Sequence, residues 1–337
     1  MLQITLDEPR IFSARTDAPD PKPAPGEALV RVHRIGVCGT DLHAFAGRQP
    51  FFNYPRILGH ELGVEVIDPG SDPHGLKAGD RCSLEPYLNC GHCIACRRGK
   101  PNCCTSLNVL GVHSDGGMRP FLAVPARKLH RSAKLDYEQL ALVETLGIGA
   151  HAVERAEIKP DDFVLVIGAG PIGLSVIQFA LVTGATVAVM DVSESRLTFC
   201  RDQLGVKHTL TPTESPAKLK EIFGGDLPTI VLDATGNAGS MAGTFDLIAH
   251  GGRIVFVGLF QGDVSFNDPN FHRREITVCA SRNAVPQTFR DIIALIEAGR
   301  IDTRPWITHR FALVDTPKLF PEKIAGNPAV LKAMIEV

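Results

Sequence analysis

The central part of the chain alternates between short, fully apolar runs and longer segments of mixed polarity. The apolar runs have the length of strands, and the segments between them have the length of helices. Strands that are hydrophobic on both faces and separated by helices predict an α/β domain with a parallel sheet. The expected strands are 163–167, 186–191, 229–234, 253–258 and 275–280, and the expected helices are 172–183, 194–204, 217–223 and 239–250.

The first 150 residues follow a different pattern. They are rich in Gly, Pro, His and Cys, and their strand-like stretches are short, at 28–33, 62–67 and 121–124. This pattern predicts an irregular β-rich domain whose loops carry function. A helical segment at 145–156 leads into the parallel sheet. After the sheet come a helix at 289–299 and several prolines, without another strand–helix repeat. We therefore expect the last segment to return to the first domain.

Composition narrows the classes of function. The chain has 337 residues, enough for about two domains, and its net charge is only −2, without a basic block or an acidic tail. This composition argues against nucleic acid or a membrane surface as a partner. No apolar run reaches the roughly 18 residues that span a bilayer, and the first residues lack the features of a secretory signal. We expect a cytoplasmic protein that binds small molecules.

Four cysteines are spaced as metal ligands. Cys90, Cys93 and Cys96 lie three residues apart, and Cys103 and Cys104 follow shortly after. Zn²⁺ favours four thiolates, and a closed set of four protein ligands is structural. The spacing does not choose between Cys103 and Cys104 as the fourth ligand, and an iron–sulfur cluster is the alternative occupant.

A second set of candidate ligands lies upstream. Cys38 and His60 supply a thiolate and an imidazole, both of which bind zinc well. Glu61 is adjacent to His60, so the two suit a loop or strand end from which both reach one metal region. A zinc ion there would be available for chemistry, because the four-cysteine set already accounts for a structural ion.

A glycine-rich turn indicates a dinucleotide site. It follows the strand 163–167 and opens a helix, which is the context that a G-x-G-x-x-G motif needs to bind a pyrophosphate. Asp191 ends the next strand, where a carboxylate binds ribose hydroxyls and repels a 2′-phosphate, so the expected cofactor is NAD. The alternatives are a nucleotide-free turn with Asp191 as a helix cap, and Arg196 as a surface cation. The candidate cofactor residues are Gly168, Gly170, Pro171, Ile172, Gly173, Asp191 and Arg196.

Together these motifs resemble the zinc-dependent medium-chain dehydrogenases, the family of alcohol, sorbitol and threonine dehydrogenases. The resemblance runs along essentially the whole chain. It implies a GroES-like zinc catalytic domain (1–148), a Rossmann NAD-binding domain (149–281) and a C-terminal segment (282–337) that returns to the catalytic domain. The motifs that carry it are 38–43 (CGTDLH), 59–61 (GHE), the cysteine set, 115–117 (DGG), 144–149 (ETLGIG), 168–173 and Asp191.

The resemblance assigns roles to individual residues. Cys38 and His60 become ligands of a catalytic zinc, Glu144 occupies the third-ligand position, and Glu61 binds directly or from the second shell. Cys104 is preferred to Cys103 in the structural site, which gives two zinc ions per chain. Thr40 and His43 match the family's proton relay. From the residues alone, the alternatives are Thr40 as a helix N-cap and His43 as a surface histidine.

Within the family, the segments 47–59, 108–118 and 307–310 are similar to bacterial sugar-acid dehydrogenases of the galactonate and gulonate 5-dehydrogenase type. An aldonate needs a cation for its carboxylate, and Arg48 and Arg119 are the candidates, with surface arginines as the alternative. The expected reaction is hydride transfer from a secondary alcohol of a sugar acid or polyol to NAD. The alternatives are a threonine or simple alcohol dehydrogenase, and a catalytically silent NAD- and zinc-binding protein. The resemblance also implies a homodimer or homotetramer.

Overall fold

The computed structural model describes residues 1–50, 52–71 and 74–337 and divides the chain into two compact units. The first unit combines Met1–Thr145 with Val285–Val337, and the second is Leu146–Ala284. Phe51, within the segment compared with sugar-acid dehydrogenases, lies outside the described residues. The domain limits placed at 148 and 281 stay predictions.

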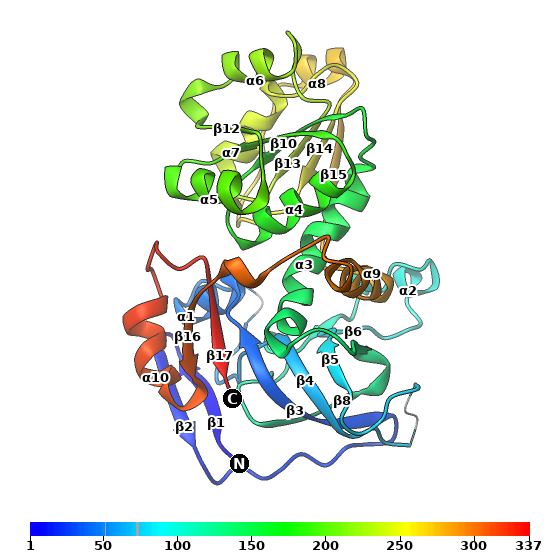
Figure 1. Cartoon of the computed structure of the whole chain (residues 1–337), viewed down its shortest axis with the longest axis vertical. Helices are drawn as coiled ribbons and strands as arrows, with labels where there is room; N and C mark the ends of the chain where they lie inside the picture. The colour runs from blue at the N-terminus through cyan, green and yellow to red at the C-terminus, as the bar shows by residue number, and fades with distance from the viewer. Residues whose placement is uncertain (51, 72–73) are drawn as a thin grey trace. The chain divides into compact units, whose positions relative to one another are not determined.

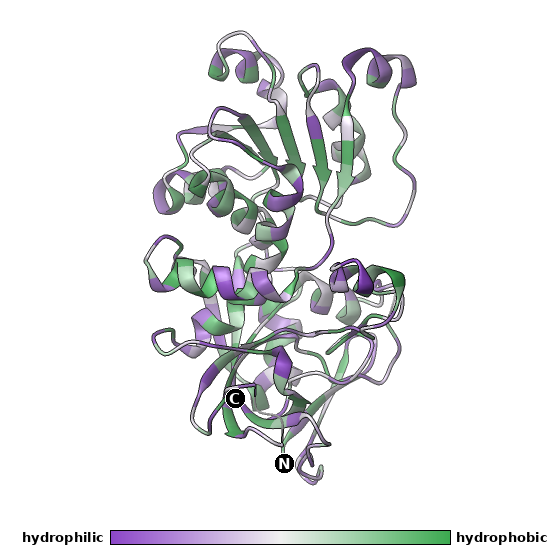
Figure 2. Cartoon of the chain, turned by 90° about the vertical axis from the view of Figure 1, so that its right-hand side faces the viewer, coloured by the Kyte–Doolittle hydropathy of each residue, from purple (hydrophilic) through white to green (hydrophobic). Residues whose placement is uncertain are grey.

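The second unit is built on a six-stranded parallel sheet with the order β12-β11-β10-β13-β14-β15 (Figure 1). Its strands are largely hydrophobic (Figure 2), which agrees with burial on both faces. Helix α4 packs on β10 and β11, and α5 packs on β11 and β12. The strands are β10 Phe163–Ile167, β11 Thr186–Met190, β12 His208–Leu210, β13 Ile230–Asp233, β14 Arg253–Phe256 and β15 Thr277–Ala280; the helices are α4 Pro171–Val182, α5 Glu194–Leu204, α6 Ala217–Ile222, α7 Ala238–Gly243 and α8 Asp268–Arg274.

The predicted sheet is therefore confirmed, and one of its helices is shorter than expected. The helix predicted for 239–250 ends at Gly243 and continues as a single 3₁₀ turn over Thr244–Asp246. The Thr244 hydroxyl donates to the Met241 carbonyl at 2.7 Å, and such a local side-chain bond competes with the helical backbone pattern. Strand β12, at the sheet edge, was not predicted because it is only three residues long.

The first unit has a mainly antiparallel sheet with the order β16-β17-β3-β4-β5-β9, and β8 pairs with β3 (Figure 1). Two small two-stranded sheets, β1-β2 and β6-β7, complete it. The strands are β1 Gln3–Glu8, β2 Ile11–Arg15, β3 Glu27–Gly36, β4 Glu61–Asp68, β5 Arg81–Leu84, β6 Tyr87–Leu88, β7 Asn108–Val109, β8 Phe121–Pro125, β9 Leu129–Arg131, β16 Ile307–Ala312 and β17 Lys332–Glu336; the helices are α1 Gly39–Phe45, α2 Ile94–Arg97, α9 Pro286–Glu297 and α10 Thr316–Leu319. Helix α3 (Tyr137–Ala156) begins in this unit, and its residues from Leu146 onward belong to the second unit.

Helix α3 begins at Tyr137, eight residues before the predicted start at 145. Its first turn is capped reciprocally: the Gln139 N–H donates to Asp136 Oδ1 at 2.8 Å, and the Asp136 N–H donates to Gln139 Oε1 at 3.2 Å. This is the capping-box arrangement, with aspartate and glutamine as the pair. Because of the earlier start, Glu144 lies in the middle of a long helix rather than before one.

The C-terminal segment belongs to the sheet of the first unit. Strand β17 pairs with β16 on one side and with β3 on the other, so residues near the end of the chain lie beside residues near its beginning. This pairing brings Lys332 to the start of β4. Among the described residues, no helix combines the length and the apolar character that crossing a bilayer requires.

Candidate metal and dinucleotide sites

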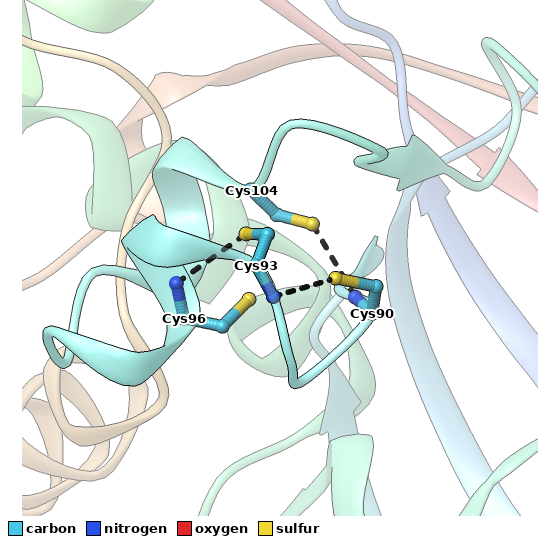
Figure 3. Close-up of side chains that lie close together, drawn as sticks. All are labelled: Cys90, Cys93, Cys96 and Cys104. Carbon is cyan, nitrogen blue, oxygen red and sulfur yellow. Dashed lines mark hydrogen bonds between the residues drawn. The ribbon is translucent and has the colours of Figure 1, made fainter.

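The four-cysteine set forms one compact cluster in the first unit. The sulfur atoms of Cys90, Cys93, Cys96 and Cys104 all lie within 4.8 Å of one another, and Figure 3 shows them turned toward a common centre. Backbone N–H groups donate to these sulfurs, from Cys90 to Cys104 at 3.3 Å and from Cys93 to Cys90 at 3.4 Å. Hydrogen bonds from backbone N–H groups, first that of Cys96, lower the pKa of Cys93 to about 5. Four sulfur atoms at this spacing, with the Cys93 thiolate stabilised, fit a tetrahedral zinc ion.

The cluster contains Cys104, which is buried, and not Cys103, which is exposed. We expect Cys104→Ser to lower the zinc content by about one ion per chain, because a structural zinc site needs its four ligands. Metal analysis of the purified variant checks this. Cys103→Ser is the matched control and is expected to keep the full zinc content; equal loss in both variants would contradict the assignment.

A second cluster joins three of the upstream candidates. Each of Cys38, His60 and Glu61 offers one ligand atom, and these three atoms lie within 4.8 Å of one another. Cys38 is the N-cap of helix α1, and Glu61 is the first residue of strand β4. Gly36 pairs with Glu61 across β3 and β4, and a Cβ on Gly36 would lie 2.0 Å from Glu61 Oε2. The glycine therefore leaves the space that the carboxylate occupies.

Asp41 supports this cluster from the same helix. Its Oδ2 accepts the Cys38 backbone N–H at 2.9 Å, and its Oδ1 lies 3.7 Å from His60 Nδ1. Burial alone would lower the pKa of His60, but the charges of Asp41 and Cys38 outweigh it and raise this pKa well above its ordinary value. The negatively charged groups around His60 therefore favour a positive charge at this place.

These residues fit a metal ion. Sulfur, nitrogen and oxygen donors converge, and zinc binds all three types. Two buried atoms at the cluster, Asp41 Oδ1 and His60 Nδ1, have no hydrogen-bond partner among the described residues. Buried polar atoms normally have a partner, so these atoms indicate that another group, such as a metal ion, binds here.

Two further residues bind the carboxylates at the cluster. Lys332 Nζ lies 2.6 Å from Glu61 Oε1 and 2.5 Å from Glu61 Oε2, and it donates to Thr145 Oγ1 at 3.2 Å. The Tyr87 hydroxyl donates to Glu144 Oε1. Burial raises the pKa of Glu144. The positive charge of His60 opposes this effect, and the negative charge of Glu61 adds to it. Glu144 lies outside the group of three ligands, so its role as a metal ligand stays a prediction.

The predicted relay residues both lie on helix α1. Thr40 is its second residue and Cys38 is the N-cap, so the alternative of Thr40 as N-cap is wrong. His43 is exposed, and partial burial, with a smaller contribution from the charge of Arg48, lowers its pKa. A lowered pKa keeps the imidazole neutral and able to accept a proton at neutral pH.

The glycine-rich turn joins β10 to α4 in the second unit. Gly170 is the N-cap of α4 and Pro171 its first residue. A Cβ on Gly173 would lie 1.8 Å from the Gly168 carbonyl oxygen, so only glycine allows this close approach. The N-terminus of a helix after such a turn is a site for a pyrophosphate, and Gly170, Pro171 and Ile172 are half-buried there.

Asp191 and Arg196 both contact this turn. Asp191 Oδ2 accepts the Ala169 N–H at 2.6 Å, and Asp191 Oδ1 accepts the Ser193 N–H at 2.8 Å. Arg196 Nη1 donates to the Ala169 carbonyl at 3.3 Å. Ser193, not Asp191, is the N-cap of α5, so the alternative of Asp191 as that cap is wrong. Both predicted residues therefore lie at the glycine-rich turn.

The two candidate substrate arginines have different surroundings. Arg119 Nε donates to the Gly116 carbonyl at 3.1 Å, and burial lowers the pKa of its guanidinium. Arg48 is exposed. Their roles as substrate cations stay predictions.

Sequence reasoning missed Asp41, Tyr87 and Lys332. Asp41 had a usable signal, because an acid three residues after the cysteine ligand falls in the first turn of the same helix. Tyr87 and Lys332 had none, since each reaches the cluster through tertiary structure.

Comparison with known proteins identifies the class. The model of the alcohol dehydrogenase GroES-like domain matches residues 24–134, and the model of the zinc-binding dehydrogenase domain matches residues 171–298. The chain belongs to the zinc-dependent medium-chain dehydrogenase family and is an oxidoreductase of the alcohol and polyol dehydrogenase type.

Individual relatives refine this picture. The chain is 41% identical to L-galactonate-5-dehydrogenase of Escherichia coli K12 over 317 residues, which cover 94% of this chain and 93% of the relative. A solved alcohol dehydrogenase from E. coli CFT073 in complex with NADH aligns with a TM-score of 0.90 at 27% identity, over 100% of this chain and 99% of that one. A zinc-binding dehydrogenase from Sinorhizobium meliloti 1021 bound to NADP aligns with the same score, identity and coverage.

Proposed function

We propose that this protein oxidises a secondary hydroxyl of a sugar acid or polyol and transfers the hydride to NAD. The observation that carries the proposal is the convergence of Cys38, His60 and Glu61. Asp41 accepts a hydrogen bond from the Cys38 backbone N–H, and Lys332 pairs with Glu61. The similarity to a galactonate dehydrogenase favours an aldonate as the substrate. The reaction converts the alcohol and NAD⁺ into a carbonyl compound, NADH and a proton.

The chain's own residues supply binding and proton transfer. Cys38, His60 and a carboxylate from Glu61 or Glu144 would hold a zinc ion, and Cys90, Cys93, Cys96 and Cys104 would hold a second, structural one. A zinc ion bound by Cys38 and His60 would supply Lewis acidity, which would make a substrate hydroxyl easier to deprotonate. The Thr40 hydroxyl would take that proton, and His43 would pass it to solvent.

The deciding experiment is a substrate screen that follows NADH at 340 nm with aldonates and polyols, on protein whose zinc content is measured. Turnover of an aldonate supports the proposal. Turnover of threonine or a simple alcohol alone would move the protein to another branch of the family, and no turnover of any alcohol by fully zinc-loaded protein would favour a silent binding protein.

The preference for NAD rests on Asp191, which directly follows strand β11 beside the glycine-rich turn. A carboxylate there favours free ribose hydroxyls and repels a 2′-phosphate. The ratio of kcat/KM with NAD to that with NADP measures the preference. A higher value with NADP would refute this role of Asp191.

His43→Ala is expected to lower kcat near neutral pH by about 100-fold, the lower end of what positioned proton transfer contributes. The loss should shrink at high pH, where hydroxide in solvent accepts the proton directly. The pH dependence of kcat for the wild type and the variant checks this, with His250→Ala, another exposed histidine, as the control. Parallel pH profiles of variant and wild type would remove His43 from the mechanism.

The cytoplasmic location and the homo-oligomeric state belong to the same proposal. A four-thiolate zinc site requires reduced cysteines, which a reducing compartment maintains. Light scattering of the purified protein distinguishes a monomer from the expected dimer or tetramer.

A further inference from the structure

Two buried carboxylates, one in the candidate metal cluster and one near it, are bound by partners that differ in charge. Glu61 is fully buried and forms an ion pair with the Lys332 ammonium, which is 2% exposed. Glu144 is 5% exposed and accepts a hydrogen bond from the Tyr87 hydroxyl, which belongs to a side chain that is 2% exposed. A cation largely cancels the charge of its carboxylate, whereas a neutral phenol only orients it.

We propose that Tyr87 is a positioning residue, which holds Glu144 through Oε1 and leaves its negative charge available to the metal at the Cys38–His60 cluster. This inference rests on the proposed function, because it takes that cluster to be the catalytic metal site. It assigns different tasks to the two carboxylates: Lys332 engages Glu61, and Tyr87 orients Glu144.

The phenol of Tyr87 is itself held firmly. Tyr87 pairs with Val109 across β6 and β7, and its ring packs edge-on against Phe289 with the ring centroids 6.2 Å apart. Two residues earlier, Glu85 is buried and accepts hydrogen bonds from Lys128 and, at 3.1 Å, His130. A side chain anchored by strand pairing, ring packing and a neighbouring buried network is a suitable orienting group.

Glu144 needs such a partner. It lies in the middle of helix α3, and its charge is close enough to His60 to raise the pKa of that imidazole. The nearby charge of Glu61 repels it, and burial removes the water that would otherwise solvate it. Without the Tyr87 hydroxyl, the carboxylate loses a hydrogen bond and becomes free to turn away from the cluster.

The test is Tyr87→Phe, which removes the hydroxyl and keeps the ring. Partners of metal ligands typically contribute 10- to 100-fold to metal affinity, so we expect the Kd of Co²⁺ at the catalytic site to rise by about that factor. The visible absorption of Co²⁺ at this site should also change, whereas the absorption of Co²⁺ in the four-cysteine site should not. The control is Tyr137→Phe, which removes a hydroxyl at the start of the same helix from a ring that stacks on His33.

A double-variant cycle separates positioning from a general effect on folding. If Tyr87 acts through Glu144, Tyr87→Phe should change neither the Co²⁺ spectrum nor the Kd further in a Glu144→Ala background. Tyr87→His, which keeps a ring and an N–H donor, should give a Kd between those of the wild type and Tyr87→Phe. If Tyr87→Phe folds poorly, Tyr87→His can replace it in the comparison with and without Glu144.

The outcomes separate this inference from the function on which it rests. Wild-type affinity and spectrum in Tyr87→Phe, or equal effects with and without Glu144, would overturn the positioning role and leave the dehydrogenase proposal standing. If wild-type protein binds Co²⁺ only in the four-cysteine site, the proposed function and the inference both fail.

Discussion

Cys38→Ser is expected to abolish dehydrogenase activity, with kcat/KM falling by at least about 1,000-fold. The physical reason is the loss of the one thiolate from the cluster in which ligand atoms of Cys38, His60 and Glu61 converge. Without the metal, the transition state loses several kcal/mol of charge stabilisation, and each 1.36 kcal/mol is about tenfold in rate. The measurement is kcat/KM with the best substrate from the aldonate and polyol screen, together with the zinc content of the same sample.

The zinc content makes this prediction specific. Cys38→Ser should lose about one zinc ion per chain and keep the other, because the four-cysteine cluster uses none of the same residues. Cys200→Ser is the control, since Cys200 is a buried cysteine of the second unit that belongs to neither cluster. A Cys38→Ser protein with full zinc content and normal turnover would show that the Cys38 cluster is not the catalytic centre.

The parallel sheet was predictable because its strands are locally encoded. Each central strand is buried on both faces, so it appears in the sequence as a continuous apolar run bounded by turn residues. The glycine-rich turn follows the first strand directly, and Asp191 follows the second. The individual strands and the cofactor site therefore depend on residues close together in the chain, whereas the strand order, in which β10 pairs with the distant β13, was not predicted.

The sheet of the first unit was much less predictable, because its strands pair with distant partners. Strand β3 pairs with β4, β8 and β17, and β17 lies at the other end of the chain. Short strands with one exposed face give weak local signals. Composition indicated a β-rich domain, but neither the pairing nor the early start of helix α3 could be obtained from periodicity.

The candidate site shows the same division. Cys38, His60 and three of the cysteines were proposed from residue type and spacing, and Cys104 was preferred to Cys103 because of the resemblance to the family. Lys332 was not, because it is 271 residues from Glu61, and nothing local distinguishes it from a surface lysine. Tyr87 was missed for a related reason: its hydroxyl gains a role only when α3 brings Glu144 to it, 57 residues further along the chain.

Lys332→Met is expected to destabilise the first unit by about 3–5 kcal/mol. Lys332 and Glu61 are both almost fully buried, and removing one partner of a buried ion pair leaves an uncompensated charge. Trp306 is the only tryptophan and is fully buried in the first unit, so its fluorescence during urea unfolding reports on this unit. The measured quantity is the free energy of unfolding obtained from that transition.

Two variants show whether the loss comes from the buried charge. Arg131→Met breaks an exposed pair of the same unit, Arg131 Nη1 to Asp80 Oδ2 at 3.7 Å, and should cost less than about 1 kcal/mol. Adding Glu61→Gln to Lys332→Met removes the unpaired charge and should restore much of the lost stability, because the remaining amide is neutral. Two results would contradict a role of the buried charge. One is a loss of unfolding free energy in Lys332→Met no larger than that in Arg131→Met, and the other is a further loss when Glu61→Gln is added. Either result would mean that the pair contributes to stability through packing alone.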